Sequence, residues 1–228
     1  SSNGLSSLEQ PAKNKRDKID KNAKVLNCIL IPLGKIIRWV RILPKWGLKM
    51  NVNHKSDFRK NCIKKLEFSS RFSKYYKDKT IIKKLEYFID KSDVKNILLY
   101  VPLGAEVDTF PLINKIRKSK DKNIYVPYMQ GDSFKIVKYR LPLHKKRFGI
   151  KEPKNSFLKP NKIDLAIVPI VGVDAIGKRI GFGKGMYDRF FDRLGYEPTI
   201  IFTQLTLCKS DKVLSNKYDI QADYIITN

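Results

Sequence analysis

The sequence predicts one α/β domain in three layers, with a mostly parallel central sheet flanked by helices. Short apolar runs without polar interruption, typical of strands buried on both faces, alternate with amphipathic stretches at helical spacing. The 228 residues suit one domain with an appended tail. Because 42% of the residues are hydrophobic and 11% aromatic, the chain can bury enough apolar surface to offset its ordering entropy, which excludes disorder throughout.

Two amphipathic helices open the predicted domain. Ser56 can cap the first of them, because its hydroxyl can accept a hydrogen bond from a free backbone amide of the first turn. The apolar residues that then share one side of this helix are Phe58, Cys62, Ile63 and Leu66. A stronger stripe for a second helix consists of Ile81, Ile82, Leu85, Phe88 and Ile89.

Strands and helices alternate through the rest of the chain. We expect helices over 106–117 and 186–194. The expected strands are 97–101, 124–126, 134–139, 165–171, 199–202 and 224–227. In such open sheets, ligands bind at the carboxyl ends of the strands, so we expect the site there.

Residues 1–54 are expected to be a basic, poorly ordered extension, and residues 55–228 the folded domain. The most apolar part of the extension, 25–48, contains four basic residues and two prolines, which argues against a membrane-spanning helix. Two interpretations remain open for it. One is a helix that binds a membrane surface or a partner. The other, which we favour, is an extension without function that precedes Met50.

The formal net charge of +25 attracts polyanions such as nucleic acid and phospholipid head groups. However, 36 of the 47 basic residues are lysines, whereas bidentate recognition of bases and phosphates favours arginine. The lysines are also scattered in pairs such as Lys64–Lys65 and Lys83–Lys84. We therefore favour a solvated basic surface over a dedicated nucleic-acid surface.

The three cysteines, Cys28, Cys62 and Cys208, lie too far apart in the sequence for any paired metal-ligand spacing. No secretory signal is evident, because no long uncharged apolar run follows a short basic start. Reduced thiols and a cytoplasmic location are the expectation that fits best.

The segment 164–192 carries the strongest chemical signal. A predicted buried strand leads through a turn to Arg179, after which Gly181, Gly183 and Gly185 alternate with Phe182 and Lys184 before a helix. Glycines at this spacing let backbone amides approach phosphate oxygens, and a helix start adds further donors. Arg179 and Lys184 would supply countercharge, and Asp188 could hold magnesium.

The glycine loop can be compared with other glycine-rich motifs. A Walker loop is absent, because its lysine is followed by Ser or Thr whereas Lys184 is followed by Gly185. A dinucleotide-binding loop is a weak match, since about ten residues separate the strand from the glycines. A purely structural turn between strand and helix accounts for the loop, taken alone, as well as phosphate binding does.

The run VPIVGVDAIGKRIGFGKGMYDRFF, at 168–191, resembles the signature of 5-formyltetrahydrofolate cyclo-ligases, also called 5,10-methenyltetrahydrofolate synthetases. Further resemblances follow in the family's order, over about residues 55–228. They are the basic helix start at Lys55, Arg59 and Lys60, the segments 101–113 and 147–153, and the closing segment from Tyr218–Asp219 to Thr227. The resemblance implies a fold similar to that of ribose-phosphate isomerases and CoA transferases.

The resemblance also implies a reaction, in which ATP and Mg²⁺ drive the cyclisation of 5-formyltetrahydrofolate to 5,10-methenyltetrahydrofolate with release of ADP and phosphate. ATP phosphorylates the formyl oxygen, N10 attacks the activated carbon, and phosphate leaves. The implied partners are these small molecules, for a monomeric enzyme without specific nucleic-acid binding or stable membrane insertion. The alternative is a basic nucleic-acid-binding protein of the same fold without this activity.

The implied site residues fall into four groups. The catalytic residues are Arg179, Lys184 and Tyr187. ATP would bind Lys55, Arg59, Arg179, Gly181, Phe182, Gly183, Lys184, Gly185, Met186, Tyr187 and Asp188. The folate would bind Val101, Glu106, Tyr128 and Tyr187, and the metal Asp188 and Asp219.

Several of these residues have a purely structural alternative. Lys55 and Arg59, taken alone, fit solvated helix residues better than ligands. Glu106 and Asp108 lie where a helix is expected to begin, and its dipole stabilises carboxylates without any ligand. Met186 also departs from the family's usual tyrosine, which removes a hydroxyl group and a flat ring from the folate side.

Overall fold

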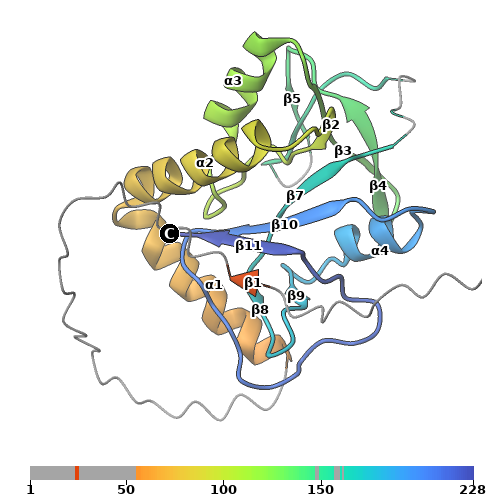
Figure 1. The fold of residues 1–228 in the computed structure, drawn as a ribbon. Helices are drawn as coiled ribbons and strands as arrows, with labels where there is room; N and C mark the ends of the chain where they lie inside the picture. The colour runs from red at the N-terminus through yellow and green to blue at the C-terminus, as the bar shows by residue number, and fades with distance from the viewer. Residues whose placement is uncertain (1–23, 26–54, 147–148, 157–159, 161) are drawn as a thin grey trace, which may run out of the picture.

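The computed structural model describes residues 24–25, 55–146, 149–156, 160 and 162–228 (Figure 1). The described strands of its central sheet are β1 (Lys24–Val25), β2 (Asn96–Leu98), β3 (Asn123–Gln130), β4 (Ser133–Lys138), β7 (Leu165–Pro169), β10 (Thr199–Gln204) and β11 (Tyr224–Thr227). Two small hairpins pair β5 (His144–Lys145) with β6 (Lys151–Glu152) and β8 (Gly172–Val173) with β9 (Arg179–Ile180). The described helices are α1 (Lys55–Arg71), α2 (Lys74–Asp90), α3 (Phe110–Ser119) and α4 (Met186–Asp192).

The central sheet has the strand order β1-β11-β10-β7-β2-β3-β4. Every neighbouring pair is parallel except β3 and β4, which form an antiparallel pair at one edge. The predicted mostly parallel sheet is therefore confirmed. β2 pairs with β7, so the loops that leave the carboxyl ends of these two strands start side by side.

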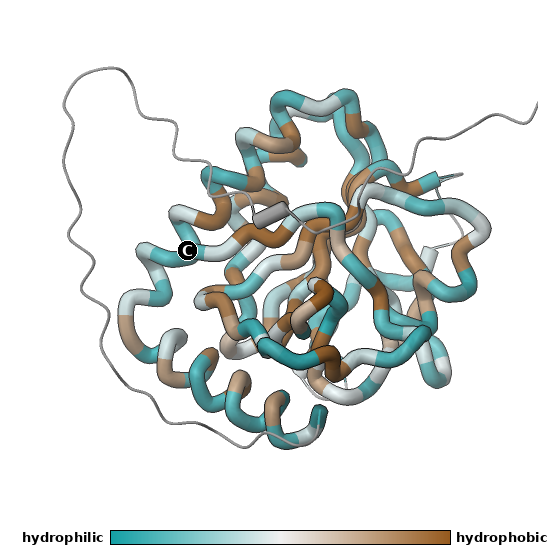
Figure 2. The backbone as a smooth tube through the Cα atoms, turned by 60° about the horizontal axis from the view of Figure 1, so that its bottom comes forward, coloured by the Kyte–Doolittle hydropathy of each residue, from teal (hydrophilic) through white to brown (hydrophobic). Residues whose placement is uncertain are grey.

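Successive apolar side chains of the central strands pack against helices on opposite faces of the sheet, which produces the three layers. Ile97 and Leu165 belong to the hydrophobic cluster that contains the apolar faces of α1, α2 and α3. Their neighbours Leu98 and Ala166 belong to the opposite cluster, which contains Phe190 of α4. Successive side chains of a strand point to opposite faces, so the sheet is apolar on both sides. Figure 2 shows the hydrophobic strands inside and hydrophilic segments along the outer helices.

Several boundaries differ from those expected. The helix expected from Glu106 begins at Phe110 instead, because Leu103 to Glu106 form a turn in which the Glu106 amide donates to the Leu103 carbonyl over 2.8 Å. Pro111 lies in the first helical turn, where its missing amide hydrogen costs nothing. β2 and β7 end before Val101 and Val171, whereas β3 extends to Gln130 by pairing with β4.

The expectation of reduced thiols is wrong for two of the three cysteines. Cys62 on α1 forms a disulfide with Cys208, which follows β10, across a sequence separation of 146 residues. Both cysteines are buried. Their contact results from the packing of α1 against this part of the chain, which local sequence spacing does not reveal. Cys28 lies outside the described residues.

The predicted division at residue 54 agrees with the start of α1 at Lys55 but stays a prediction. Within the extension the structure describes only Lys24–Val25, which pairs in parallel with β11. The remainder, including the apolar segment 26–48, lies outside the described residues. In the part of the chain that is described, no helix is long and apolar enough to cross a membrane.

Candidate active site

The glycine loop connects β9 to α4, and its backbone requires glycine at two positions. Gly183 has φ +100° and Gly185 has φ +62°, conformations that residues with a Cβ atom rarely adopt. At Gly181 the constraint is steric, because an added Cβ would clash with the buried guanidinium group of Arg179. The three predicted glycines therefore shape one tight loop that is bounded by arginine side chains.

Arg179 anchors this loop from inside the protein. Its side chain is only 5% exposed, and Nε and Nη2 each donate to the carbonyl oxygen of Pro169, the last residue of β7. Nη1 donates to Oδ2 of Asp188 on α4 over 3.2 Å. The guanidinium group also lies 5.1 Å from the ring centroid of Tyr187. A buried cation thus links the carboxyl end of β7 to the first turn of α4.

The two basic residues of α1 expected to bind ATP, Lys55 and Arg59, are not merely solvated. Arg59 donates from Nε to the carbonyl oxygen of Gly181 over 2.8 Å, and Lys55 donates from Nζ to both carboxylate oxygens of Asp219. The start of α1 therefore contacts the glycine loop and the segment before β11. These contacts bring together three motifs that are separated in the sequence.

The predicted metal ligands, Asp188 and Asp219, lie on neighbouring segments. Oδ1 of Asp188 accepts a hydrogen bond from the amide of Ile220, the residue after Asp219. Each carboxylate also faces a cation, Arg179 for Asp188 and Lys55 for Asp219. Among the described residues, no group of three or more His, Cys, Asp or Glu side chains is placed to hold a metal ion.

A cleft of about 550 Å³ joins the glycine loop to Glu106. Its walls come from α1, the start of α2, the loop after β2 and the glycine loop. The lining residues are Ile63, Leu66, Glu67, Ser70, Arg71, Lys74, Leu103, Gly104, Ala105, Glu106 and Phe182. Apolar residues such as Leu66, Leu103 and Phe182 line the cleft together with charged ones, and such a lining suits a flat, partly polar ligand.

Glu106 is the strongly perturbed acid of this cleft. Burial of its carboxyl group raises the pKa to about 7, against smaller lowering effects of the Leu103 amide, Arg179 and Lys74. Oε2 accepts a hydrogen bond from the Leu103 amide over 2.8 Å. Burial also raises the pKa of the nearby Tyr187 hydroxyl, and the charge of Glu106 adds to that rise. A carboxyl group that titrates near neutral pH is typical of functional sites.

The remaining expected folate residues are less well placed. Tyr187 packs its ring against Phe134 at 5.0 Å, between the glycine loop and the sheet. Met186 begins α4, and its carbonyl accepts from Ser133. Val101 and Tyr128 pack in or against the core and do not line the described cleft. Phe182, expected on the ATP side, lines the cleft that contains Glu106.

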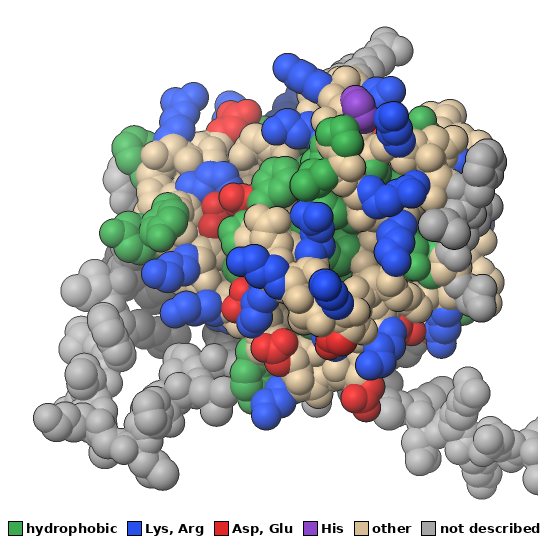
Figure 3. Space-filling model, turned by 90° about the horizontal axis from the view of Figure 1, so that it is seen from above, with side chains coloured by type: hydrophobic (Ala, Val, Ile, Leu, Met, Phe, Trp, Pro, Cys, Tyr) green, Lys and Arg blue, Asp and Glu red, His purple; other side chains and the backbone are tan. Residues whose placement is uncertain are grey.

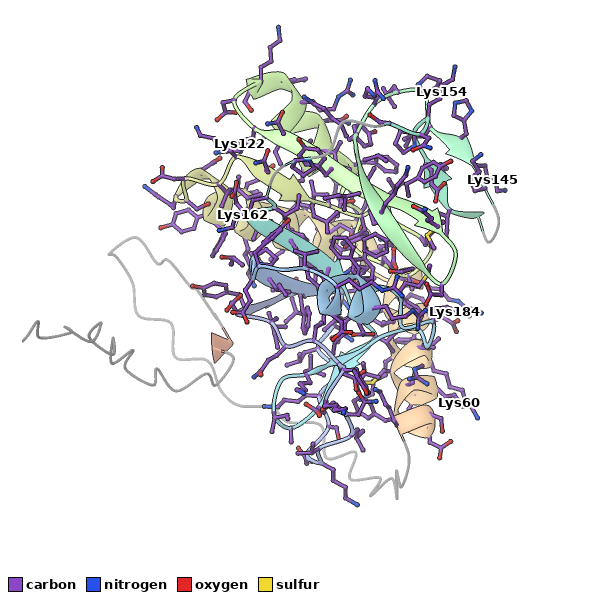
Figure 4. All side chains as sticks on the ribbon, turned by 90° about the vertical axis from the view of Figure 1, so that its right-hand side faces the viewer. Lys60, Lys122, Lys145, Lys154, Lys162 and Lys184 are labelled. Atoms are coloured by element: carbon purple, nitrogen blue, oxygen red, sulfur yellow. A yellow bond between two sulfur atoms is a disulfide. The ribbon has the colours of Figure 1, made fainter. Side chains whose placement is uncertain are left out.

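Lys184 lies on the exposed side of the glycine loop. In Figure 4 it extends from the same side of the molecule as Lys60 of α1, whereas Lys122 and Lys162 lie on the opposite side of the view. Figure 3 shows that Lys and Arg side chains on one face are distributed among acidic and hydrophobic ones. This distribution resembles the solvated basic surface expected from the sequence rather than one binding stripe.

Three charged residues near the site have no counterpart among the sequence predictions. Lys74 and Arg71 line the cleft from the α1–α2 turn. Asp78 forms an ion pair of 2.9 Å with Lys74, one helical turn away. The spacing of Lys74 and Asp78 indicates an ion pair on a helix, but the sequence gives no sign that the pair contacts the Glu106 loop.

Comparison with known proteins agrees with this geometry. The model of the 5-formyltetrahydrofolate cyclo-ligase family matches residues 51–228, a span that includes every site residue described above. The chain belongs to the 5-formyltetrahydrofolate cyclo-ligase family. Membership identifies it as a ligase of folate chemistry and confirms the resemblance first seen in the glycine segment.

Individual members of the cyclo-ligase family align over most of their length. A 5-formyltetrahydrofolate cyclo-ligase of Mycoplasma pneumoniae is 30% identical over 175 residues, covering 76% of this chain and 98% of that protein. A solved 5,10-methenyltetrahydrofolate synthetase from the same species has a TM-score of 0.61 at 28% identity, covering 75% of this chain and 97% of the other. The NMR structure of the Aquifex aeolicus synthetase gives 0.62 at 27% identity, with coverages of 76% and 89%.

Proposed function

We propose that this protein uses ATP to cyclise 5-formyltetrahydrofolate to 5,10-methenyltetrahydrofolate, releasing ADP and phosphate. One observation carries the proposal beyond family membership. Phe182 of the glycine loop and Glu106 line a single cleft. A phosphate-binding segment and a folate-binding carboxyl group must share one cavity if the γ-phosphate is to reach the formyl oxygen.

The ATP end of the site consists of the glycine loop and the basic residues around it. We assign the backbone of Gly181, Phe182, Gly183 and Gly185, together with Met186 and Tyr187 at the start of α4, to the nucleotide. Lys55, Arg59, Arg179 and Lys184 supply positive charge. Support comes from the α1 residues, because Arg59 and Lys55 reach the glycine loop and Asp219. Cations at this position neutralise the charge that develops during phosphoryl transfer.

Asp188 and Asp219 would hold a magnesium ion in this scheme. Magnesium is commonly bound by one or two carboxylates together with substrate phosphates and waters, and the hydrogen bond from the Ile220 amide to Asp188 keeps these two residues on adjacent segments. Carboxylate oxygens are ligands that suit the ion, and each of the two carboxylates would share its charge between the metal and the cation that it faces, Arg179 or Lys55. When bound, magnesium neutralises phosphate oxygens and orients them.

The folate end is assigned to Glu106, with Tyr187 where the two ligands meet. A carboxyl group with a pKa of about 7 can accept or donate a hydrogen bond near neutral pH, so Glu106 suits the polar edge of a pterin or its formyl group. The apolar cleft residues Leu103 and Phe182 suit the flat middle of the ligand. Val101, Tyr128 and Tyr187 do not line the described cleft, and Tyr187 is assigned because its hydroxyl is close enough to Glu106 for that charge to raise its pKa. Val101 and Tyr128 stay predictions.

The chemistry assigns the protein chiefly a positioning role. The formyl oxygen attacks the γ-phosphorus of ATP and ADP leaves, which converts a poor electrophile into an activated one. N10 then attacks the formyl carbon and loses its proton, and the C–O bond breaks as phosphate departs with the former formyl oxygen. Arg179, Lys184 and the loop amides hold the transferred group, and Glu106 and Tyr187 align the folate.

The decisive experiment couples the two substrates. Purified protein with magnesium should consume ATP only when 5-formyltetrahydrofolate is present, and the methenyl absorbance should rise in step. Lys184→Ala should lower kcat/KM for ATP about 30-fold or more, equivalent to about 2 kcal/mol, because a charged transition-state contact is lost. Lys154→Ala, an exposed lysine on a different part of the surface, is the control. ATP consumption that ignores the folate would reject the proposal.

We further propose that the enzyme acts as a monomer in the cytoplasm. One chain supplies every group assigned above, so the site needs no second copy, and size-exclusion chromatography with light scattering tests this. The cytoplasmic location is in tension with the Cys62–Cys208 disulfide, because such bonds are more frequent in oxidising compartments. Cell fractionation shows in which compartment the native protein lies, and thiol labelling shows whether Cys62 and Cys208 are reduced there.

A further inference from the structure

The loop that carries Glu106 is held by two residues of α2, Lys74 and Asp78. Lys74 donates from Nζ to the carbonyl oxygen of Glu106 over 2.7 Å. Asp78 accepts at Oδ1 from the amide of Asp108 over 3.1 Å. Lys74 and Asp78 are themselves joined by an ion pair of 2.9 Å. The pair therefore holds the backbone on both sides of Val107, at the Glu106 carbonyl and at the Asp108 amide.

Other contacts fix the same loop from its remaining sides. Val107 is 1% exposed, and its carbonyl accepts a hydrogen bond from the hydroxyl of Tyr100 over 3.1 Å. The turn from Leu103 closes through the Glu106 amide, and the Glu106 carboxylate accepts from the Leu103 amide. Glu106 thus has its amide, its carbonyl and its carboxyl group each engaged. Only the carbonyl contact comes from α2.

We propose that Lys74 and Asp78 are positioning residues that fix where the Glu106 carboxyl group meets the folate. The inference rests on the proposed function for its substrate and deepens it. The two α2 side chains are mostly buried, with 27% and 14% of their surface exposed, so their contacts are well shielded from water. A misplacement of about 1 Å at a reacting centre can cost on the order of 100-fold in rate. Holding both ends of a short loop prevents such a shift.

Lys74 and Asp78 also affect the charge of Glu106. The titratable and charged groups around Glu106 are Arg179 from β9, Tyr187 from α4, Tyr100 after β2 and the α2 pair, and Glu67 and Arg71 line the same cleft. Lys74 lowers the pKa of Glu106, and Asp78, whose negative charge opposes that of Lys74, forms an ion pair with it. Removing Lys74 should therefore raise that pKa, whereas removing the charge of Asp78 should lower it.

The test compares Lys74→Met and Asp78→Asn with a matched control on the same helix. Lys84→Met is that control, because Lys84 also donates to a backbone carbonyl, that of Thr227, over 2.8 Å but away from the cleft. Each α2 variant should lose 10-fold or more in kcat/KM for 5-formyltetrahydrofolate, while KM for ATP stays within about twofold. Lys74→Arg, which keeps the charge and the donors, should recover most of the loss.

A second measurement works without any substrate. Carboxyl ¹³C NMR of glutamate-labelled protein, with the Glu106 signal assigned through Glu106→Gln, reports the pKa of Glu106 directly. We expect an upward shift in Lys74→Met, a downward shift in Asp78→Asn and no shift in Lys84→Met. General loosening of the fold would not shift the pKa of Glu106 in opposite directions in Lys74→Met and Asp78→Asn.

The two measurements separate this inference from the proposed function. If the wild-type protein does not couple ATP consumption to 5-formyltetrahydrofolate, the proposed function fails. The NMR shifts alone then decide whether Lys74 and Asp78 set the position and the pKa of the Glu106 carboxyl group. If the wild type is active but both α2 variants match Lys84→Met in folate kinetics and in the pKa of Glu106, the positioning role is overturned. Opposite pKa shifts with a folate-selective loss support it.

Discussion

Lys55, the first residue of α1, donates from Nζ to Oδ1 of Asp219 over 2.6 Å, although 164 positions separate them in the sequence. The carboxylate is only 10% exposed, so this ion pair is shielded on the acidic side. It connects the start of the folded domain to the segment before its last strand. A residue that the sequence alone would leave as a solvated helix lysine is thereby placed beside an expected metal ligand.

The first prediction concerns this ion pair. Lys55→Met should lower kcat/KM for ATP by 10-fold or more, because a cation next to the proposed phosphate site is lost and the Asp219 carboxylate loses its countercharge. Lys60→Met is the control, since the Lys60 side chain is 75% exposed and its contact to Asp57 is 3.9 Å long. Steady-state kinetics at saturating folate measure both. Equal ATP kinetics in the two variants would contradict the role of Lys55.

The second prediction concerns the backbone of the glycine loop. Gly183→Ala should lower the free energy of unfolding by about 1–2 kcal/mol, because φ +100° is strained for a residue with a Cβ atom. It should also weaken ATP use, since relaxing that strain moves the loop amides. Gly195→Ala is the matched control: no heavy atom lies within 4 Å of its added Cβ, and its φ lies outside the left-handed range. ATP kinetics that are the same in both variants would argue against phosphate binding by this loop.

The third prediction concerns the disulfide between α1 and the segment after β10. Cys208→Ser should lower the free energy of unfolding by about 2–4 kcal/mol, because the bond closes a loop of 146 residues in the unfolded chain. Urea unfolding measures the loss. A reductant should lower the free energy of unfolding of the wild type by a similar amount and leave that of Cys208→Ser unchanged. A wild-type protein that is insensitive to reductant, with all of its thiols free, would show that the bond does not form in solution.

The strand core could be predicted because both faces of the central strands are buried. Leu165–Pro169 has five consecutive buried residues, and such a run leaves little alternative to a central parallel strand. The sequence pattern places the start of α3 too early, because the amphipathic spacing continues through Glu106 and Val107. A hydrogen-bonded turn precedes Pro111 there, and its geometry depends on contacts from α2.

The candidate site was predictable only where a local motif marked it. Arg179 and Gly183 stand in one recognisable segment, so the sequence could single them out. That the guanidinium of Arg179 binds the Pro169 carbonyl, and that Lys74 binds the Glu106 carbonyl, are long-range packing results. The Cys62–Cys208 contact is of the same kind. No local pattern indicates which distant backbone atom a lysine or arginine will meet.

The last prediction follows from the raised pKa of Glu106. The folded protein holds this carboxyl group with a pKa of about 7, against 4.5 as its ordinary value. Between these values the folded state keeps the proton while the unfolded state loses it, so folding takes up a proton and stability falls as the pH rises. The contribution of the protonated Glu106 carboxyl group to the free energy of unfolding is fully present below about pH 4.5 and is lost as the pH rises through about 7.

Glu106→Gln, which has no titrating group, should remove this part of the pH dependence. Relative to the wild type, the Gln variant should gain up to about 3 kcal/mol in unfolding free energy between about pH 5 and pH 8. Urea unfolding at several pH values measures the gain, with Glu197→Gln, an exposed glutamate, as the control. Parallel stability curves for the wild type and Glu106→Gln would mean that Glu106 is ionised throughout this range. In that case the folate would meet a permanent carboxylate rather than a group able to exchange its proton near neutral pH.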